Sequence, residues 1–428
     1  MADKMNINRA WETLFARYDI VERAAREGSF RISSSEINTV KEARLMAKFD
    51  RSSQLPEIFK ANKLSILPIS RGEYIIGSFA THTRVIYPGT KPTPVVDPRL
   101  ETLDSSNLYS EASALLFAYN SGIIQNIMNT SKVAFTVFGR MSSGSFDYTI
   151  EDSHALGISK NISVQNAQIE IDAGYESAEA FCVCEAKNIA ADELLIRQLY
   201  YPYRLWATKI SKPIVPLFLT FSNDIFHAFI YSFEDVTNYN SIKLMEHRAY
   251  TFADEDISLA EVIELWKNIK TLEEPQAPFP QADSFERIFD LLSVLADGAL
   301  TRDEITLKYA FVDRQTNYYI AACEYLGFVG RGNNTEGERE FFLTPEAKRI
   351  MMLRYKQKHM EVIKKVLECP VFNRAFGMAL NGGELPDKSM VCQIMRESNL
   401  SINETTIDRR SSTVRGWLDW IFRISAAE

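Results

Sequence analysis

Three chemically active side chains lie close together in the middle of the sequence. Asp172 ends the run QIEID, and Glu185 and Lys187 end the apolar run AFCVCEAK. A hairpin with its turn at residues 177–180 places Asp172 directly opposite Glu185, about 5 Å away between Cβ atoms. Because side chains alternate between the two faces of a strand, Lys187 shares the face of Glu185. The spacing therefore predicts two carboxylates and an amine at one end of a β-hairpin.

Two facing carboxylates repel each other unless a cation or a proton lies between them. Mg²⁺ binds one or two carboxylates together with waters and substrate phosphate oxygens, and it helps to form hydroxide from bound water. Lys187 would orient that water or neutralise charge developing at phosphorus. We therefore expect a phosphoester-hydrolysis site. Two alternatives stay open: a surface hairpin with ordinary charges, and Glu170, on the face of Asp172, as the first metal ligand.

The pattern of Asp172 followed by Glu185-x-Lys187 at the end of a hydrophobic strand resembles the PD-(D/E)xK nuclease superfamily. One departure is Ile171, which stands where the superfamily motif has a proline that is commonly absent. The resemblance covers about 165 residues for the nuclease core, and the C-terminal third in addition.

Two further residues extend the resemblance. Glu111, in the helical run SEASALLFAYNSG, matches a helical glutamate that often assists metal binding in the superfamily. Gln198, in RQLYYPYRLW, matches a polar residue often found on its second helix. The whole arrangement resembles Type II restriction endonucleases with an added winged-helix DNA-binding domain.

The resemblance implies Mg²⁺-dependent, site-specific cleavage of double-stranded DNA that leaves 5′-phosphate and 3′-hydroxyl ends. It assigns metal binding to the side chains of Asp172 and Glu185 and to the carbonyl of Ala186. It assigns the attacking water to Lys187. Gln198 and Arg197 would hold the adjacent phosphate or order the site, and a surface ion pair is an equal alternative for Arg197.

The elements that position these residues indicate a mixed α/β fold. We expect an N-terminal α+β domain over residues 1–105, which contacts DNA or dimerises, and a nuclease core over 106–270. In that core a central mixed sheet is flanked by helices, with one helix over 110–128 and another over 191–210. The proline-rich run TLEEPQAPFPQAD predicts a linker over 271–283, before a mainly helical domain over 284–428.

The last domain shows the order helix, helix, helix and two-stranded hairpin, which is typical of a winged helix. Its third helix would read DNA, because Arg pairs with guanine and Gln and Asn pair with adenine. A solvated helix start capped by Asp313 is the alternative. The candidate DNA-reading residues are Arg314, Gln315, Thr316, Asn317 and Tyr318.

Two basic stretches add candidate phosphate contacts. One is a helix over 345–367, with seven basic residues between Lys348 and Lys365 against a single glutamate. The other is IDRRSSTVRGWLDWIF, in which three arginines flank an apolar stripe. A solvated helix face is the alternative for each. The residues we expect to bind DNA here are Lys348, Arg349, Arg409, Arg410 and Arg415.

Composition limits the remaining choices. The 428 residues are 46% hydrophobic and 24% charged, as in globular proteins, and the net charge of −8 argues weakly against a nucleic-acid partner. Five cysteines, no apolar signal core and no apolar run long enough for a membrane span favour the cytoplasm.

Other function classes lack their motifs. There is no phosphate-binding loop of a translocating motor, and no methyltransferase signature, so protective methylation would need a separate methyltransferase. Cutting both strands needs two active centres, which favours a homodimer. Two alternatives stay open: a DNA-binding regulator with an inactive nuclease-like core, and a repair or mobile-element nuclease.

Overall fold

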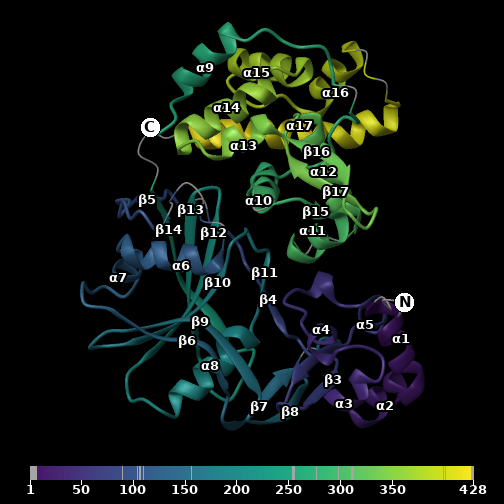
Figure 1. Ribbon diagram of the computed structural model, residues 1–428, viewed down its shortest axis with the longest axis vertical. Coiled ribbons are helices and arrows are strands. Elements are labelled where there is room, and N and C mark those ends of the chain that lie inside the picture. The colour runs from purple at the N-terminus through teal and green to yellow at the C-terminus, as the bar shows by residue number, and fades with distance from the viewer. Residues whose placement is uncertain are drawn as a thin grey trace.

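The computed structural model describes residues 7–88, 90–103, 105, 108, 110–155, 157–252, 256–275, 277–296, 298–309, 313–398, 400 and 402–425. Its helices and strands form three groups (Figure 1). We call them the N-terminal group (7–77), the central group (82–251) and the C-terminal group (259–425). As the sequence predicts, the fold is mixed α+β, and a seven-stranded mixed sheet occupies the central group.

The N-terminal group packs short helices against a three-stranded antiparallel sheet of order β1-β3-β2. Its core holds Trp11, Phe15 and Phe59, whose rings meet edge to face. The elements are α1 (Ile7–Tyr18), α2 (Ile20–Glu27), β1 (Phe30–Ser33), α3 (Ser34–Asn38), α4 (Ala43–Met46), the 3-10 helix η1 (Ser52–Gln54), α5 (Glu57–Ala61), β2 (Ser65–Pro68) and β3 (Glu73–Gly77).

The central sheet has the order β5-β14-β13-β12-β10-β9-β6. The pairs β10–β12 and β14–β5 are parallel, and the other pairs are antiparallel. The elements are β4 (His82–Arg84), β5 (Thr93–Pro94), α6 (Glu111–Asn120), α7 (Ile123–Ile127), β6 (Ala134–Ser142), β7 (Ser145–Glu151), β8 (Ser159–Gln165), β9 (Gln168–Glu176), β10 (Phe181–Lys187), β11 (Glu193–Leu195), α8 (Arg197–Ala207), β12 (Ile214–Ser222), β13 (Ile225–Phe233) and β14 (Ile242–Thr251). Strands β7 and β8 pair as a separate hairpin, and β11 pairs with β4.

Helices cover both faces of the seven-stranded sheet (Figure 1). Tyr200 and Leu205 of α8 share one apolar cluster with Phe181 of β10. On the other face, Phe117 of α6 and Ile124 of α7 share a cluster with Cys184. Strand β10 is therefore buried on both faces, which explains why its sequence is an unbroken apolar run.

Both expected helices of the central group are shorter than the sequence suggests. The helix expected over 110–128 is broken between α6 and α7 by Gly122, whose φ of 85° lies in the left-handed region that glycine tolerates. The helix expected over 191–210 begins instead with the strand β11, because residues 193–195 pair with β4. Long-range pairing overrides the local helical pattern in that segment.

The C-terminal group has one large apolar core. Its three-stranded antiparallel sheet has the order β15-β17-β16. The helix expected over 345–367 is interrupted at residues 352–354. The elements are α9 (Leu259–Asn268), α10 (Phe285–Ala296), β15 (Leu300–Thr301), α11 (Arg302–Tyr309), α12 (Asp313–Tyr325), β16 (Val329–Asn333), β17 (Arg339–Leu343), α13 (Pro345–Met351), α14 (Tyr355–Leu367), α15 (Pro370–Gly382), α16 (Lys388–Glu397) and α17 (Glu404–Ser425).

The segment before α10 packs into this core. Phe279 and Ala282, within the expected linker, are buried in the same cluster as Trp417 of α17. The indole Nε1 of Trp417 also donates to the carbonyl of Ala282 at 2.6 Å. This part of the chain is therefore attached to the C-terminal group. No described helix combines the length and hydropathy that crossing a membrane requires.

Candidate active site

The β9–β10 hairpin has the expected register. Its paired residues run from Phe181 opposite Glu176 to Cys184 opposite Ala173, so the predicted turn at 177–180 is confirmed. The ladder ends one pair before Asp172 and Glu185, while β10 continues to pair with β12 as far as Lys187. The two strands therefore separate at the position where the carboxylates lie.

Asp172 occupies an irregular point of β9. The register of β9 against β6 shifts between Val137 and Gly139, close to Asp172. Ile171 packs on one face of the sheet and Ala173 on the other, so the simple alternation expected along this strand breaks here. Irregular pairing of this kind redirects side chains.

The side chain of Asp172 takes the place of a strand partner. Its Oδ2 accepts the backbone N–H of Ala186 at 2.9 Å. This contact keeps the Asp172 carboxylate beside β10 after the two strands have separated. It also leaves the carboxylate next to Glu185, the preceding residue of β10, and a side-chain hydrogen bond between the two carboxyl groups favours the charged form of Asp172.

Glu185 lies at the centre of the cluster and is only 5% exposed. Its Oε1 contacts the Nζ of Lys187 at 2.5 Å and accepts a hydrogen bond from the Nε2 of Gln198. Gln198 is the second residue of α8. Glu111, the first residue of α6, places its Oε1 3.6 Å from the Nζ of Lys187. The structure thus brings together all five side chains that the sequence analysis singled out for catalysis.

Burial and like charges raise the pKa values of the carboxyl groups. Burial raises the pKa of Glu185 to about 8, with Lys187 opposing the shift and Asp172 adding to it. Burial also raises the pKa of Asp172, against the opposing charge of Lys187. The pKa of Glu111 is raised, chiefly by burial. The site therefore concentrates negative charge in a poorly solvated place, as a cation-binding site does.

The pKa of Lys187 is also raised, but here the shift favours the charged form of the side chain. Burial disfavours its charged form, but the carboxylates of Glu185 and Glu111 outweigh burial and raise the pKa of the amine. Lys187 is therefore an ammonium ion at neutral pH, and it donates to Glu185 rather than accepting a proton.

Asp50 is a member of this acidic cluster that the sequence analysis missed. Its negative charge raises the pKa values of Glu111, Glu185 and Lys187, so it faces the same site from the N-terminal group. The neighbouring Ser52 donates its backbone N–H to Glu193 Oε1 at 2.5 Å and fixes this loop to β11. No local pattern marks Asp50, because contacts between residues far apart in the sequence bring it to the site, among them the contact of Ser52 with Glu193 across 141 residues.

The donor set fits a magnesium ion in kind. Among the residues that the structure describes, no group of three or more His, Cys, Asp or Glu side chains is arranged to hold a metal. Mg²⁺ does not require such a group, since one or two carboxylates with waters and phosphate oxygens suffice. Asp172 and Glu185 would supply the carboxylates and Ala186 its carbonyl oxygen, and a cation there would favour the charged forms that burial disfavours in both carboxyl groups.

Arg197 lies next to this cluster rather than in it. It is the first residue of α8, and its guanidinium carbon lies 6.0 Å from the centre of the Tyr201 ring. Burial lowers the pKa of His82 and the charge of Arg197 adds to that shift, whereas burial raises the pKa of Tyr74 and the charge of Arg197 opposes that shift. The structure shows Arg197 among aromatic side chains, and its predicted phosphate contact stays a prediction.

The candidate DNA-reading residues of α12 divide into exposed and buried ones. Gln315 and Asn317 are exposed and Tyr318 is half-buried, while the side chain of Arg314 lies outside the described part of the structure. Thr316 is fully buried, and its hydroxyl pairs with that of Thr306 at 2.8 Å. Thr316 therefore joins α11 to α12, and we withdraw it as a DNA contact.

The basic stretch over 345–367 is largely neutralised by acidic partners. Lys348 and Arg349 of α13 are exposed, but Arg349 lies 3.6 Å from Glu361. Further along, Lys358 is buried against Asp224. Lys356 and Lys365 also contact glutamates. Much of the apparent positive charge is thus used within the fold.

The arginines of α17 lie beside α12. Arg409 and Arg415 are exposed and Arg410 is half-buried. Burial lowers the pKa of Arg410, the charge of Arg409 adds to this shift, and Tyr318 of α12 opposes it. Arg410 of α17 and Tyr318 of α12 are therefore neighbours, which the sequence alone did not indicate.

Comparisons with known proteins give the same three parts of the chain without assigning an activity. Three domains of unknown function match it: DUF6996 over residues 8–76, DUF6997 over 78–251 and DUF7226 over 287–426. No curated protein and no solved structure matches the chain. Asp172, Glu185 and Lys187 fall in the second domain, and the exposed residues of α12 and α17 fall in the third.

Proposed function

We propose that this protein is a Type II restriction endonuclease that hydrolyses phosphodiester bonds of double-stranded DNA with Mg²⁺. One observation carries the proposal. Asp172, Glu185 and Lys187 meet where β9 and β10 separate, and Gln198 of α8 and Glu111 of α6 complete the cluster. This is the set of side chains, on the same kinds of element, that the resemblance to the PD-(D/E)xK superfamily implies.

A Mg²⁺ ion held by Asp172, Glu185 and the carbonyl of Ala186 would polarise a phosphoryl oxygen and favour hydroxide formation from bound water. Lys187, kept protonated by its carboxylate neighbours, neutralises the negative charge that develops on the phosphate. Gln198 orients Glu185 through its hydrogen bond to Oε1. The protein side chains thus bind the metal ion, orient Glu185 and neutralise charge on the phosphate.

The C-terminal group is the proposed DNA reader. Helices α10, α11 and α12 followed by the β16–β17 hairpin have the order of a winged helix. Gln315 and Asn317 offer exposed amides for base edges, and Arg409 and Arg415 offer exposed charges for phosphates. A homodimer would supply two active centres for the two strands. A separate methyltransferase would protect the host sequence.

The test is cleavage of plasmid and phage DNA by the full chain, with Mg²⁺ and with EDTA. We expect discrete fragments with 5′-phosphate ends and no cleavage in EDTA. Glu185→Gln should lower the rate at least about 10³-fold, because it removes a metal ligand and a contact to Lys187. Binding of DNA, measured by gel shift, should remain.

The hairpin supplies its own control. Glu176 lies at the other end of β9 and pairs with Lys212 at 2.5 Å, away from the cluster. Glu176→Gln should cleave at the wild-type rate. If Glu185→Gln cleaves as fast as Glu176→Gln, the proposed centre is wrong. Gel shift without cleavage by the wild type would indicate a DNA-binding regulator, and cutting confined to branched DNA would indicate a repair or mobile-element nuclease.

A second experiment separates base reading from phosphate binding. Arg409→Ala and Arg415→Ala should weaken binding equally for all sequences and should each lower the salt dependence, the slope of log K against log salt, by about 1. Gln315→Ala and Asn317→Ala should instead reduce discrimination between sites, by about 1–3 kcal/mol each if both amides contact bases. Equal effects of all four variants on every sequence would contradict the assignment of α12 as reader.

A further inference from the structure

Two loops follow the parallel strands β10, which carries Glu185 and Lys187, and β12. Residues 188–192 follow β10, directly after Lys187, and residues 222–224 lie at the end of β12. Because β10 and β12 are parallel, their ends meet at the same edge of the sheet. That edge faces α10 and α14 of the C-terminal group (Figure 1).

One carboxylate of the C-terminal group joins these two loops. Asp290 of α10 accepts the hydroxyl of Ser222 at 2.6 Å through Oδ1 and the backbone N–H of Ala190 at 3.3 Å through Oδ2. Asp290 is only 3% exposed. Each of its two oxygens therefore has a partner on a different strand end.

The loop after β10 depends on such side-chain contacts. Beyond Lys187 the backbone has left the ladder with β12, and a buried N–H without a partner is costly. Asp290 supplies the acceptor for Ala190, and the hydroxyl of Tyr87 supplies it for Ala191 at 2.8 Å. Asp290 is the one of these two acceptors that belongs to the C-terminal group.

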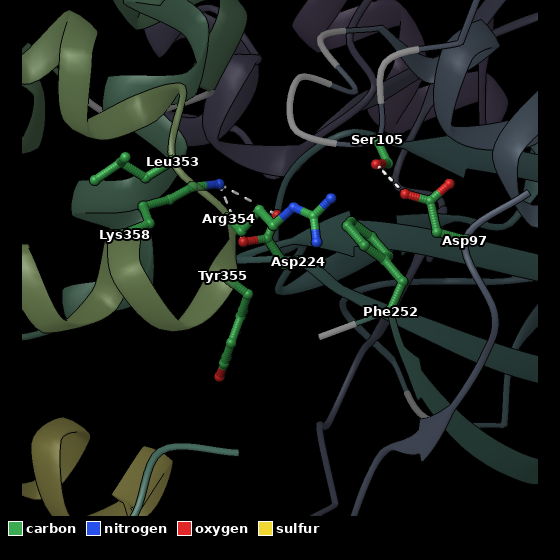
Figure 2. A pocket seen from close by; sticks show the side chains of 8 residues that line it. All are labelled: Asp97, Ser105, Asp224, Phe252, Leu353, Arg354, Tyr355 and Lys358. Atoms are coloured by element: carbon green, nitrogen blue, oxygen red, sulfur yellow. Dashed lines mark hydrogen bonds and ion pairs between the residues drawn. The ribbon is translucent and has the colours of Figure 1, made fainter. Parts of the chain in front are cut away.

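Further contacts hold the same edge against the C-terminal group. Lys358 of α14 forms a buried ion pair with Asp224 at 3.1 Å. Both residues line the pocket that Figure 2 shows. The Nε2 of His359 lies 2.6 Å from the Oδ1 of Asn223. Arg287, one turn before Asp290, pairs with Asp192. The C-terminal group therefore contacts both loops, residues 188–192 and residues 222–224.

We propose that Asp290 is a positioning residue, through which the C-terminal group sets the place of Glu185 and Lys187 in the active site. The inference rests on the proposed function and extends it, since it joins the proposed reader to the catalytic strand. In this proposal Asp290 acts through Ala190 and Ser222, not by contact with DNA or the reacting atoms. Its bond to Ala190 fixes the chain three residues after Lys187, and a displacement of about 1 Å at such a site costs about 10²-fold in rate.

The test uses three variants of the full chain. Asp290→Ala removes both contacts, and we expect single-turnover cleavage about 100-fold slower with the DNA dissociation constant within twofold. Asp290→Asn keeps both contacts, because its amide oxygen accepts from Ala190 and its amide nitrogen donates to Ser222. It should restore the rate to within about threefold. Asp290→Ser, too short to span both partners, replaces the alanine variant if that one does not fold.

Hydrogen exchange gives a readout that does not depend on cleavage. In Asp290→Ala, exchange across residues 188–192 should rise about tenfold while exchange in β12 stays unchanged. The matched control is Asp408→Asn, which removes an exposed pair with Lys388 elsewhere in the C-terminal group. It should change neither cleavage nor exchange.

A second control separates positioning from docking. The single variant Lys358→Met leaves Asp224 buried without its cation and so weakens the contact between the central and C-terminal groups without touching residues 188–192. If it slows cleavage as much as Asp290→Ala does, the effect is loss of docking and the inference is overturned. Unchanged exchange and rate in Asp290→Ala overturn it as well. A wild type that never cleaves would refute the proposed function, while exchange would still decide whether Asp290 holds the strand end.

Discussion

Asp290 should make the stability of the protein depend on pH in a way that one substitution removes. Burial raises its pKa from the ordinary 3.8 to about 7. Hydrogen bonds from Ser222 and Ala190 and the charge of Arg287 favour the carboxylate, but they do not outweigh burial. The folded chain therefore keeps a proton that the unfolded chain releases.

The magnitude follows from this difference in pKa. The stabilisation is fully present below about pH 3.8, falls as the pH rises towards 7, and is lost above it. Each pH unit in this window lowers the free energy of unfolding by about 1.4 kcal/mol, for a total of about 4 kcal/mol. Asp290→Asn cannot ionise, so its stability relative to the wild type should rise by up to about 4 kcal/mol between pH 4 and pH 8.

The assay is urea unfolding followed by circular dichroism at several pH values from 4.5 to 8. Transition midpoints are compared, because a chain of three groups need not unfold in two states. The histidines contribute equally to the pH dependence of stability in both proteins, so their contribution cancels in the difference between the two profiles. Asp408→Asn, which is exposed, should run parallel to the wild type. Parallel profiles for Asp290→Asn and the wild type across this range would refute the reasoning.

The remaining predictions concern packing. Lys358→Met leaves Asp224 buried without its cation and should lower the free energy of unfolding by about 3–5 kcal/mol, while adding Asp224→Asn should recover most of the loss in urea titrations. Gly416→Ala should destabilise by about 2 kcal/mol or more, because its Cβ would lie 2.4 Å from the carbonyl oxygen of Asp283. Gly382→Ala meets nothing within 4 Å and should leave the melting temperature unchanged or raise it slightly. Equal melting temperatures for the two glycine variants would contradict this account.

Much of the β9–β10 hairpin could be predicted from the sequence. The turn at 177–180 and the apolar run before Glu185 set the register, because a strand alternates with a period of two and a short turn leaves few pairings. The break in that alternation at Asp172 could not be predicted. It arises where β9 also pairs with β6, a strand about 35 residues away in the chain.

Burial of polar and charged side chains was the least predictable feature. Lys358 lies in the most basic stretch of the chain, yet it is buried against Asp224, which is 134 residues away. Thr316 lies among polar residues at a helix start, yet it packs inside against Thr306. In both cases the local sequence pattern predicted an exposed side chain, but packing between separate elements buries it.

The sequence by itself determined that Asp172, Glu185 and Lys187 share one hairpin, because this relation is local. Only the tertiary structure decided that Asp50 faces the site from the N-terminal group and that Asp290 holds the strand end from the C-terminal group. Contacts across such distances leave no periodic trace in a sequence, since they depend on how whole elements pack.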